Sequence, residues 1–275
     1  MMAAMASVPR LSRSPRGVCA SAVAVAVALT LAACHGAPGG PRATASDEWS
    51  RSYPLTPGGE VQITNRNGPI SLIGGDGDKV DVRVVRTVTA PTEAAARDLL
   101  PKVEIREDVR PDHVELQTVG IDGILINVST TLHYHVQAPR SAIVRLRSTN
   151  GSIEVSGLSG RVVAASTNGG LTVKGLAGGA ELRSTNGDVQ VDMASIGTDL
   201  VEVRSTNGQV KMTLPTGADA NLLASATNGR VEVADLTIEP LGEQTPRRMR
   251  GRLGRGGTPV ELTATNGNIT IAGAK

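Results

Sequence analysis

Short runs of alternating apolar and polar residues fill the chain from about residue 55 onward, and most of them flank an Asn-Gly pair. The pentapeptide RSTNG occurs at 147–151, 183–187 and 204–208, and related sequences occur elsewhere. The seven pairs are Asn67-Gly68, Asn150-Gly151, Asn168-Gly169, Asn186-Gly187, Asn207-Gly208, Asn228-Gly229 and Asn266-Gly267. Alternation with a period of two is typical of strands that bury one face. The pattern predicts pairs of strands joined at structural Asn-Gly turns.

The spacing of these turns indicates a repeat. From Asn150 the steps between successive turn asparagines are 18, 18, 21, 21 and 38 residues. A regular period of this size is typical of solenoid proteins. We interpret the step of 38 residues as a coil that has lost its motif or has taken an insertion.

Aligning the copies on the asparagine separates inward from outward positions. In the Asn150 and Asn67 copies the inward residues are Val144, Leu146, Ser148, Ile153, Val155, Val61, Ile63, Ile70 and Leu72. The intervening positions, such as Arg145, Arg147 and Thr149, face outward. Each copy thus supplies one apolar face to a core.

Two architectures fit this pattern. Asn-Gly between alternating runs is a strong signal for a β-hairpin, so a meander of hairpins is one alternative. A β-solenoid also explains why Ser, Thr and Asn repeat, because stacked asparagines can form amide ladders between coils about 4.8 Å apart. We expect Gly to supply a positive φ at the corner. We predict an all-β, single-chain β-solenoid with about 18–21 residues per coil and one short helix.

The N-terminus has the features of an export signal. Arg10, Arg13 and Arg16 precede an apolar segment at 18–33 that ends in Leu-Ala-Ala-Cys. This order resembles the signal and lipobox of bacterial lipoproteins. We predict a lipoprotein signal peptide at 1–33 and lipid attachment at Cys34; an ordinary secretory signal and a retained anchor helix are the alternatives.

The remaining chain divides into three segments. Residues 34–54 are rich in Gly, Pro, Ser and Ala and are predicted to be a flexible tether. Residues 55–140 form an N-terminal β section with a helix at 92–100 and strands at 103–107, 113–119 and 124–137. Residues 141–275 form the STNG repeat, continuous with 55–140 in one domain.

Composition and charge narrow the possible functions. One Trp, two Tyr and no Phe suit narrow aliphatic β layers. Removing residues 1–33 takes three Arg from the 28 basic residues, leaving 25 against 26 acidic residues. This balance gives no reason to expect nucleic-acid binding. With Cys19 removed and Cys34 acylated, no Cys remains for a disulfide or a metal site.

The chain resembles the bacterial toastrack proteins, an adhesin-like β-strand-repeat family of unknown function. The resemblance covers about Gly59 to Ala272. It is carried by NGPISLIGGDGDKVDV (67–82), EAAARDLL (93–100), LHYHVQAPRSAIVRLRSTNGSIEVSGLSG (132–160), the STNG units and RRMRGRLGRGGTPVELTATNGNITI (247–271). It implies a β-solenoid-like domain outside the cytoplasm, with ligand sensing or assembly as suggested roles and with no known reaction.

Several residues are candidates for chemistry, each with a simpler structural interpretation. His133 and His135 share a strand face but lack a third local ligand, so we interpret them as exposed strand residues. GGDGDKVDV (74–82) occurs once and has Lys79 where a calcium repeat needs Asp, so turn chemistry explains it better. We expect no metal and no cofactor.

The basic segment holds Arg247, Arg248, Arg250, Arg252 and Arg255. It is a candidate site for an anionic lipid or an acidic partner. The alternative is a solvated hairpin or an extra coil. The lack of nearby aromatic residues argues against single-stranded nucleic acid.

These observations favour a non-enzymatic, lipid-anchored scaffold or ligand sensor of the bacterial cell envelope, facing the periplasm or the exterior. Its partners would be the membrane, through Cys34, and an envelope protein, anionic lipid or glycan. A surface adhesin that binds glycan or another cell is the alternative, and a carbohydrate-active solenoid enzyme is a minor one. If the last coil after Ile271 is uncovered, it is expected to allow end-to-end stacking.

Overall fold

The computed structural model describes residues 42–121 and 127–274. In chain order the strands are β1 (Ala43–Pro54), β2 (Glu60–Asn67), β3 (Ile70–Gly75), β4 (Lys79–Ala90), β5 (Glu104–Arg110), β6 (His113–Val119), β7 (Ser129–Pro139), β8 (Ile143–Asn150), β9 (Ile153–Ser156), β10 (Val162–Asn168), β11 (Leu171–Leu176), β12 (Ala180–Asn186), β13 (Val189–Met193), β14 (Val201–Asn207), β15 (Val210–Leu214), β16 (Ala220–Asn228), β17 (Val231–Ala234), β18 (Ile238–Pro240), β19 (Arg248–Leu253), β20 (Thr258–Asn266) and β21 (Ile269–Gly273). The helices are α1 (Glu93–Leu99) and the 3₁₀ helix η1 (Leu100–Lys102).

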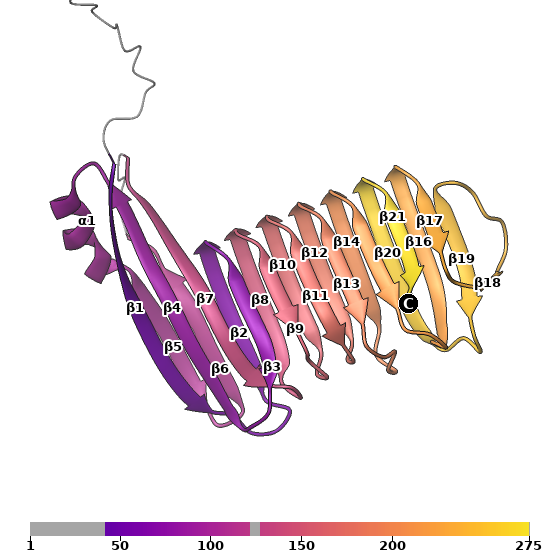
Figure 1. Ribbon diagram of the computed structural model, residues 1–275, viewed down its shortest axis with the longest axis horizontal. Coiled ribbons are helices and arrows are strands. Elements are labelled where there is room, and N and C mark those ends of the chain that lie inside the picture. Colours follow the sequence, from indigo (N-terminus) through magenta and orange to yellow (C-terminus); the bar gives the residue numbers. More distant parts are fainter. Residues whose placement is uncertain (1–41, 122–126, 275) are drawn as a thin grey trace, which may run out of the picture. The chain divides into compact units, whose positions relative to one another are not determined.

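The strands form two sheets. Sheet A has ten strands in the order β1-β4-β7-β3-β9-β11-β13-β15-β21-β17. Sheet B has eleven strands in the order β18-β19-β16-β20-β14-β12-β10-β8-β2-β6-β5. Each coil contributes one strand to sheet B, turns at its Asn-Gly pair, and contributes the next strand to sheet A (Figure 1).

Neighbouring coils pair in parallel and in register. Val162 and Asn168 of β10 lie beside Val144 and Asn150 of β8, and the same alignment recurs from coil to coil. The two strands that flank one Asn-Gly pair lie in different sheets. The predicted β-solenoid is therefore confirmed, and the hairpin alternative is wrong.

The order of the coils in space differs from their order in the chain. The Asn266 coil (β20–β21) lies between the Asn207 coil (β14–β15) and the Asn228 coil (β16–β17), as Figure 1 shows. The long chain segment between Asn228 and Asn266 contains β18 and β19, and these two strands extend sheet B beyond β16. Of the two interpretations of this step, the insertion is confirmed and the coil without its motif is wrong.

This order also corrects the expectation of an uncovered coil after Ile271. β21 is paired with β15 on one side and with β17 on the other, and Ile271 is fully buried. At this end the outermost strands are β17 in sheet A and β18 in sheet B.

The N-terminal end has a similar exchange of order. The Asn67 coil (β2–β3) lies between β8–β9 and a coil formed by β6 and β7, which follow it in the chain. Beyond them β1 and β4 extend sheet A, and β5 extends sheet B. Thr92 caps α1 by accepting a hydrogen bond from the Ala95 amide, close to the predicted start of the helix.

Residues 43–54 are not a tether. They form β1, which pairs antiparallel with β4 from Ala43–Ala90 to Pro54–Lys79. The segment is rich in small residues but alternates in burial, and Tyr53 is buried. Pairing with β4 stabilises a strand that its composition does not predict.

The predicted signal peptide (1–33), Cys34 and the first part of the tether lie outside the described residues. Within residues 42–121 and 127–274, no helix is long and apolar enough to cross a membrane.

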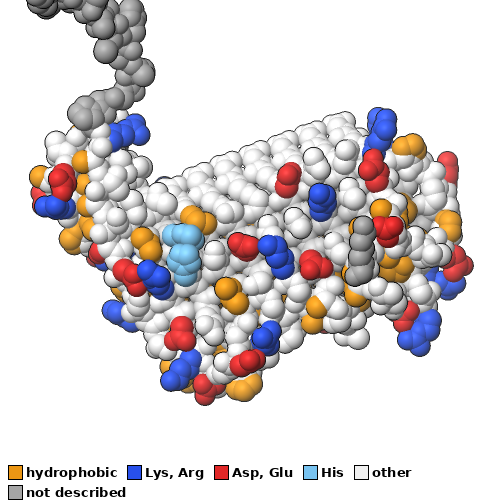
Figure 2. All heavy atoms as spheres, viewed as in Figure 1, with side chains coloured by type: hydrophobic (Ala, Val, Ile, Leu, Met, Phe, Trp, Pro, Cys, Tyr) orange, Lys and Arg blue, Asp and Glu red, His pale blue; other side chains and the backbone are white. Residues whose placement is uncertain are grey.

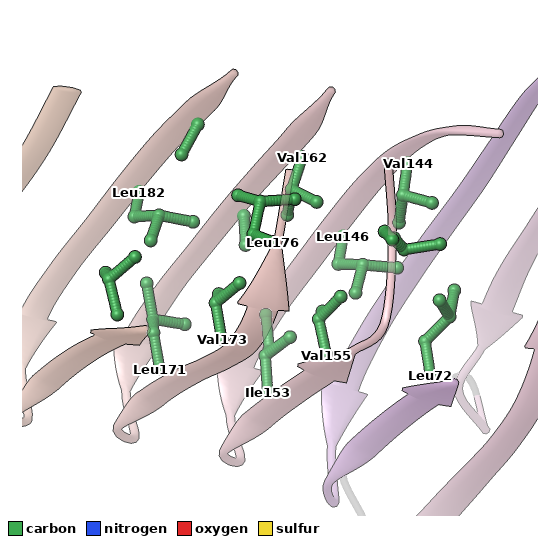
Figure 3. Close-up of a cluster of buried hydrophobic side chains, with 14 of the residues drawn as sticks. Leu72, Val144, Leu146, Ile153, Val155, Val162, Leu171, Val173, Leu176 and Leu182 are labelled. Carbon is green, nitrogen blue, oxygen red and sulfur yellow. The ribbon is translucent and has the colours of Figure 1, made fainter. Parts of the chain in front are cut away.

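The core fills the space between the two sheets with aliphatic side chains (Figure 3). Leu146, Ile153 and Leu182 are among the fully buried residues. All the inward positions aligned on the asparagines of the 141–275 repeat are buried except Val231 and Val233, which are half-buried because β17 is the last strand of sheet A. The inward assignment from the sequence is therefore confirmed.

Candidate functional site

The turn asparagines form a ladder along one edge of the solenoid. Each side-chain amide Nδ2 donates to Oδ1 of the neighbouring asparagine, over 2.7–2.9 Å. In spatial order the members are Asn67, Asn150, Asn168, Asn186, Asn207, Asn266 and Asn228. The ladder predicted for stacked asparagines is present and unbroken across the seven coils that contain an Asn-Gly pair.

The glycines of these turns are required by close approach of the backbone. A Cβ at Gly169 would lie 2.2 Å from the carbonyl oxygen of Gly151, and one at Gly267 would lie 2.0 Å from that of Gly208. Gly169 and Gly267 do not have a positive φ, whereas Gly68 has φ of 113°. The expectation that positive φ explains these glycines is wrong for most of them.

A row of serine hydroxyls supports the same corner from inside. Ser166, Ser184 and Ser205 each donate to the carbonyl oxygen of a corner glycine in the neighbouring coil, over 3.0–3.2 Å. The equivalent acceptor for Ser148 is the oxygen of Gly68, which instead accepts from Nδ2 of Asn65 at 3.0 Å. Ser148 Oγ is accordingly the one buried side-chain polar atom without a hydrogen-bond partner in the described part of the chain.

Asn65 ends the row at the N-terminal side. Its Nδ2 also donates to the oxygen of Leu132 at 2.9 Å, and its Oδ1 accepts from the hydroxyl of Thr118 at 3.0 Å. Thr118 is hydrogen-bonded to the hydroxyl of Tyr134 at 2.8 Å. This buried network joins the Asn67 coil to β6 and β7, which have no Asn-Gly corner of their own. We call the asparagine ladder, the corner glycines and these hydroxyls the corner spine. The repeated Asn, Gly and Ser residues therefore have a structural role.

The predicted basic segment lies at the C-terminal end of sheet B, mostly in β19. Arg252 binds Glu239 at 2.5 Å, and Arg255 binds Asp219 at 2.7 Å and 2.9 Å. Hydrogen bonds from the backbone and side chain of Arg255 lower the pKa of Asp219. Arg247, Arg248 and Arg250 are exposed and make no ion pair with other described residues. The segment is thus a solvated hairpin with three arginines available, and its binding role stays a prediction.

The outer face of sheet B carries ion pairs both within a strand and between neighbouring coils. Arg183 binds Glu181 at 2.6 Å and Glu202 at 3.3 Å, and Arg161 and Arg204 extend the set. These pairs satisfy most of the outward charges in the middle of the repeat.

A shallow groove of about 740 Å³ crosses the outer face of sheet A at its N-terminal end. Its walls come from β1, β4, β7 and β3, which are far apart in the chain. Register pairs place its side chains in two adjacent rows. One row is Ser50, Arg83, His135 and Ser71; the other is Ser52, Asp81, Gln137 and Ile73.

The charges of the groove are nearly balanced. Arg83 binds Glu48 at 2.7 Å beside the groove, and this contact lowers the pKa of Glu48. The rings of His133 and His135 stack with their centroids 3.8 Å apart. Burial, and then the neighbouring His135, lower the pKa of His133. On the face displayed in Figure 2, histidine side chains form a pale blue patch between acidic and basic side chains.

Sequence reasoning singled out the histidines of this region but missed the groove. It treated His133 and His135 as exposed strand residues, and the structure places His135 in the groove wall. Over the residues that the structure describes, no group of three or more His, Cys, Asp or Glu side chains could hold a metal ion. The alternation in 79–82 and in 129–137 could have indicated which side chains of each strand face outward. Only the pairing of β4 with β7 shows that these two sets of side chains are neighbours.

A family model described as Toastrack DUF4097 matches residues 108–272, from within β5 to β21. No curated protein matches the sequence significantly. A solved structure of a "putative cell adhesion protein" from Clostridium sporogenes is 15% identical, covers 83% of this chain and 100% of its own, and has a TM-score of 0.41. A "putative adhesin" from Bacteroides fragilis is 12% identical over 83% of this chain and 97% of its own, with a TM-score of 0.34. Similarity this low says nothing about what the chain binds.

Proposed function

This chain belongs to the Toastrack DUF4097 family, and we propose that it is a lipid-anchored, non-enzymatic protein of the bacterial cell envelope that binds a ligand as a sensor or scaffold. The anchor half of the proposal is supported by the basic, apolar and Leu-Ala-Ala-Cys order that ends at Cys34. The binding half is supported by the groove on sheet A.

The groove carries the proposal because its side chains are not needed by the corner spine. The repeated Asn, Gly and Ser residues bond between coils, and the arginines in the middle of sheet B bond to glutamates. Ser71, Asp81 and Gln137 instead line a solvent-exposed groove on a hydrogen-bonded frame. Binding sites combine a concave surface with a few polar groups that rigid elements hold in place.

A surface adhesin is the second candidate. The groove is open to solvent and lies on a sheet face, so a ligand carried by another cell could also reach it. The two candidates differ in which side of the cell boundary the domain occupies.

Cell fractionation tests the lipid anchor, and protease treatment of intact cells tests which side of the envelope the domain faces. The full-length protein is expected to sediment with membranes, and Cys34→Ala to become soluble after export. A Cys34→Ala protein that still sediments would contradict the lipid anchor. Protease cleavage on intact cells would favour the adhesin, and protection until the envelope is opened would favour a domain facing the periplasm.

Photo-crosslinking in living cells tests the groove. A photoreactive amino acid replaces Gln137 in β7 or, as the matched control, Gln190 in β13; both glutamines are exposed on the outer face of sheet A. The proposal predicts an adduct from position 137 and none from position 190. Equal labelling at both positions, or none at 137, would contradict a binding groove.

A further inference from the structure

We infer that the groove binds a neutral oligosaccharide; this inference rests on the proposed function and names the ligand class for the same site. Its basis is the combination of an open shape, balanced charge, paired polar groups and one exposed aliphatic side chain.

The shape fits part of a polymer. The groove crosses four neighbouring strands, three strand spacings or about 14 Å in all, and is shallow along its length. Sites for small molecules usually enclose most of the ligand. An open groove across a sheet leaves both ends of a chain free to continue into solvent, as a glycan chain requires.

The charged side chains of the groove favour a neutral ligand over a strongly anionic one. Arg83 is matched by Glu48 beside the groove, and Asp81 adds one negative charge. The side chain of Arg51 lies on the opposite face of β1, where it pairs with Glu107. Because Arg83 already binds Glu48 at 2.7 Å, its positive charge is partly neutralised and attracts a phosphate or a carboxylate less strongly. The unpaired Arg247, Arg248 and Arg250, at the other end of the solenoid, are better suited to anions.

The polar side chains suit sugar hydroxyls. Asp81 and Gln137 are direct neighbours across β4 and β7, as are Arg83 and His135 in the adjacent row. A carboxylate beside a carboxamide presents both acceptors and donors. Ring hydroxyls are both donors and acceptors, so neighbouring hydroxyls of one sugar can bond to such a pair.

The apolar component is Ile73. Its side chain is 59% exposed although it lies in the middle of a sheet, in register with Gln137 on one side and Ser156 on the other. Ile73 and the imidazole of His135 both line the groove and offer surfaces for the C–H face of a sugar ring. Binding sites combine apolar surface with a few placed polar groups, and Ile73 supplies the apolar part of this groove.

Titration calorimetry on the full-length chain in detergent micelles tests this inference. The probes are cellohexaose, mannohexaose and chitohexaose, with hexagalacturonate as the anionic control. At least one neutral probe is expected to bind, and hexagalacturonate is expected to bind at least tenfold more weakly. Preference for chitohexaose would indicate a glycan of N-acetylated sugars, and preference for either of the other two would indicate a glycan without N-acetyl groups.

Matched double variants locate the site. Asp81→Ala with Gln137→Ala is expected to weaken binding about tenfold, from two lost hydrogen bonds of about 0.5–1.5 kcal/mol each. Gln190→Ala with Asp192→Ala removes the same residue types from the outer face of β13 and is expected to change affinity less than twofold. Equal loss in both pairs would place the ligand elsewhere and overturn the inference.

Failure of this inference and failure of the proposed function are separable. If no neutral probe binds while the photoreactive residue at 137 still gives a protein adduct, the oligosaccharide is wrong and the binding groove stands. If hexagalacturonate binds best, the ligand is anionic and the inference is also overturned. If no probe binds and position 137 gives no adduct, both fail.

Discussion

Asn228 donates its side-chain amide to Oδ1 of Asn266 at 2.8 Å, although 38 residues separate them and Asn266 comes later in the chain. Asn266 in turn donates to Asn207 at 2.7 Å. The last coil of the chain is thus inserted between two earlier ones, and the ladder continues through it without a gap. Several consequences of the corner spine can be measured.

An asparagine inside the ladder should matter more than one at its end. Asn168 both donates to Asn150 and accepts from Asn186, whereas Asn228 only donates. Asn168→Ala is expected to lower the free energy of unfolding by about 1–3 kcal/mol and Asn228→Ala by about 0.5–1.5 kcal/mol. Urea denaturation of the two variants checks this order, and a larger loss for Asn228→Ala would contradict it.

The corner glycines should tolerate no side chain. A Cβ at Gly169 meets the Gly151 carbonyl oxygen at 2.2 Å, whereas one at Gly197 has its nearest contact at 3.5 Å. Gly169→Ala is expected to cost at least about 2 kcal/mol or to prevent folding, because neighbouring coils must separate. Gly197→Ala, the control, should change the thermal midpoint little. Equal stability of the two variants would show that the corners are not closely stacked.

Two serines at equivalent positions should respond differently to alanine. Ser166 donates to the Gly151 oxygen at 3.0 Å, so Ser166→Ala is expected to cost about 1 kcal/mol. Ser148→Ala removes a buried hydroxyl that has no partner and is expected to be neutral or stabilising. Chemical denaturation of both variants in parallel gives the comparison. A clear destabilisation by Ser148→Ala would mean that its hydroxyl is bonded in solution.

The two tyrosines of the chain should ionise at high pH only. Burial raises the pKa of Tyr134 from 10.0 to about 12, and burial together with the hydrogen bond to Glu107 raises the pKa of Tyr53. Between pH 10 and 12 the unfolded chain therefore loses tyrosine protons that the folded chain keeps, so stability is lost as the pH rises through this range. Ultraviolet titration of the folded protein should place both midpoints above pH 10; a midpoint at 10 for either tyrosine would contradict its burial.

The regular part of this fold can be predicted because the information is local. Alternation around Asn150 or Asn186 fixes which side chains face inward, and the repeated Asn indicates stacking. The position of the Asn266 coil cannot be predicted in this way, because its own sequence fits equally well beside Asn207 or beyond Asn228. β1 was missed because Ser46, Ser50 and Ser52 are ordinary in a tether, and only pairing with β4 orders them.

The groove was beyond prediction for the same reason. Ser50, Ser71, Asp81 and Gln137 have no motif and span more than eighty residues of sequence. They meet because β7 pairs with β3 on one side and with β4 on the other. Sequence spacing cannot show this order without the register of the sheet.

The continuous corner spine is the central claim, because it assigns the repeated residues to the fold and leaves the groove available for function. Disulfide trapping tests it most directly, in a background in which Cys19 and Cys34 are serine. Thr206 and Thr265 lie on adjacent strands in register, about 4.8 Å apart, and Thr206 and Thr227 are two strands apart, at about 10 Å.

Thr206→Cys with Thr265→Cys is predicted to form a disulfide on oxidation, since the spacing lies within the range that a disulfide spans. Thr206→Cys with Thr227→Cys is predicted to stay reduced. Efficient bonding of the second pair and none of the first would contradict the inserted coil, and with it the continuous ladder.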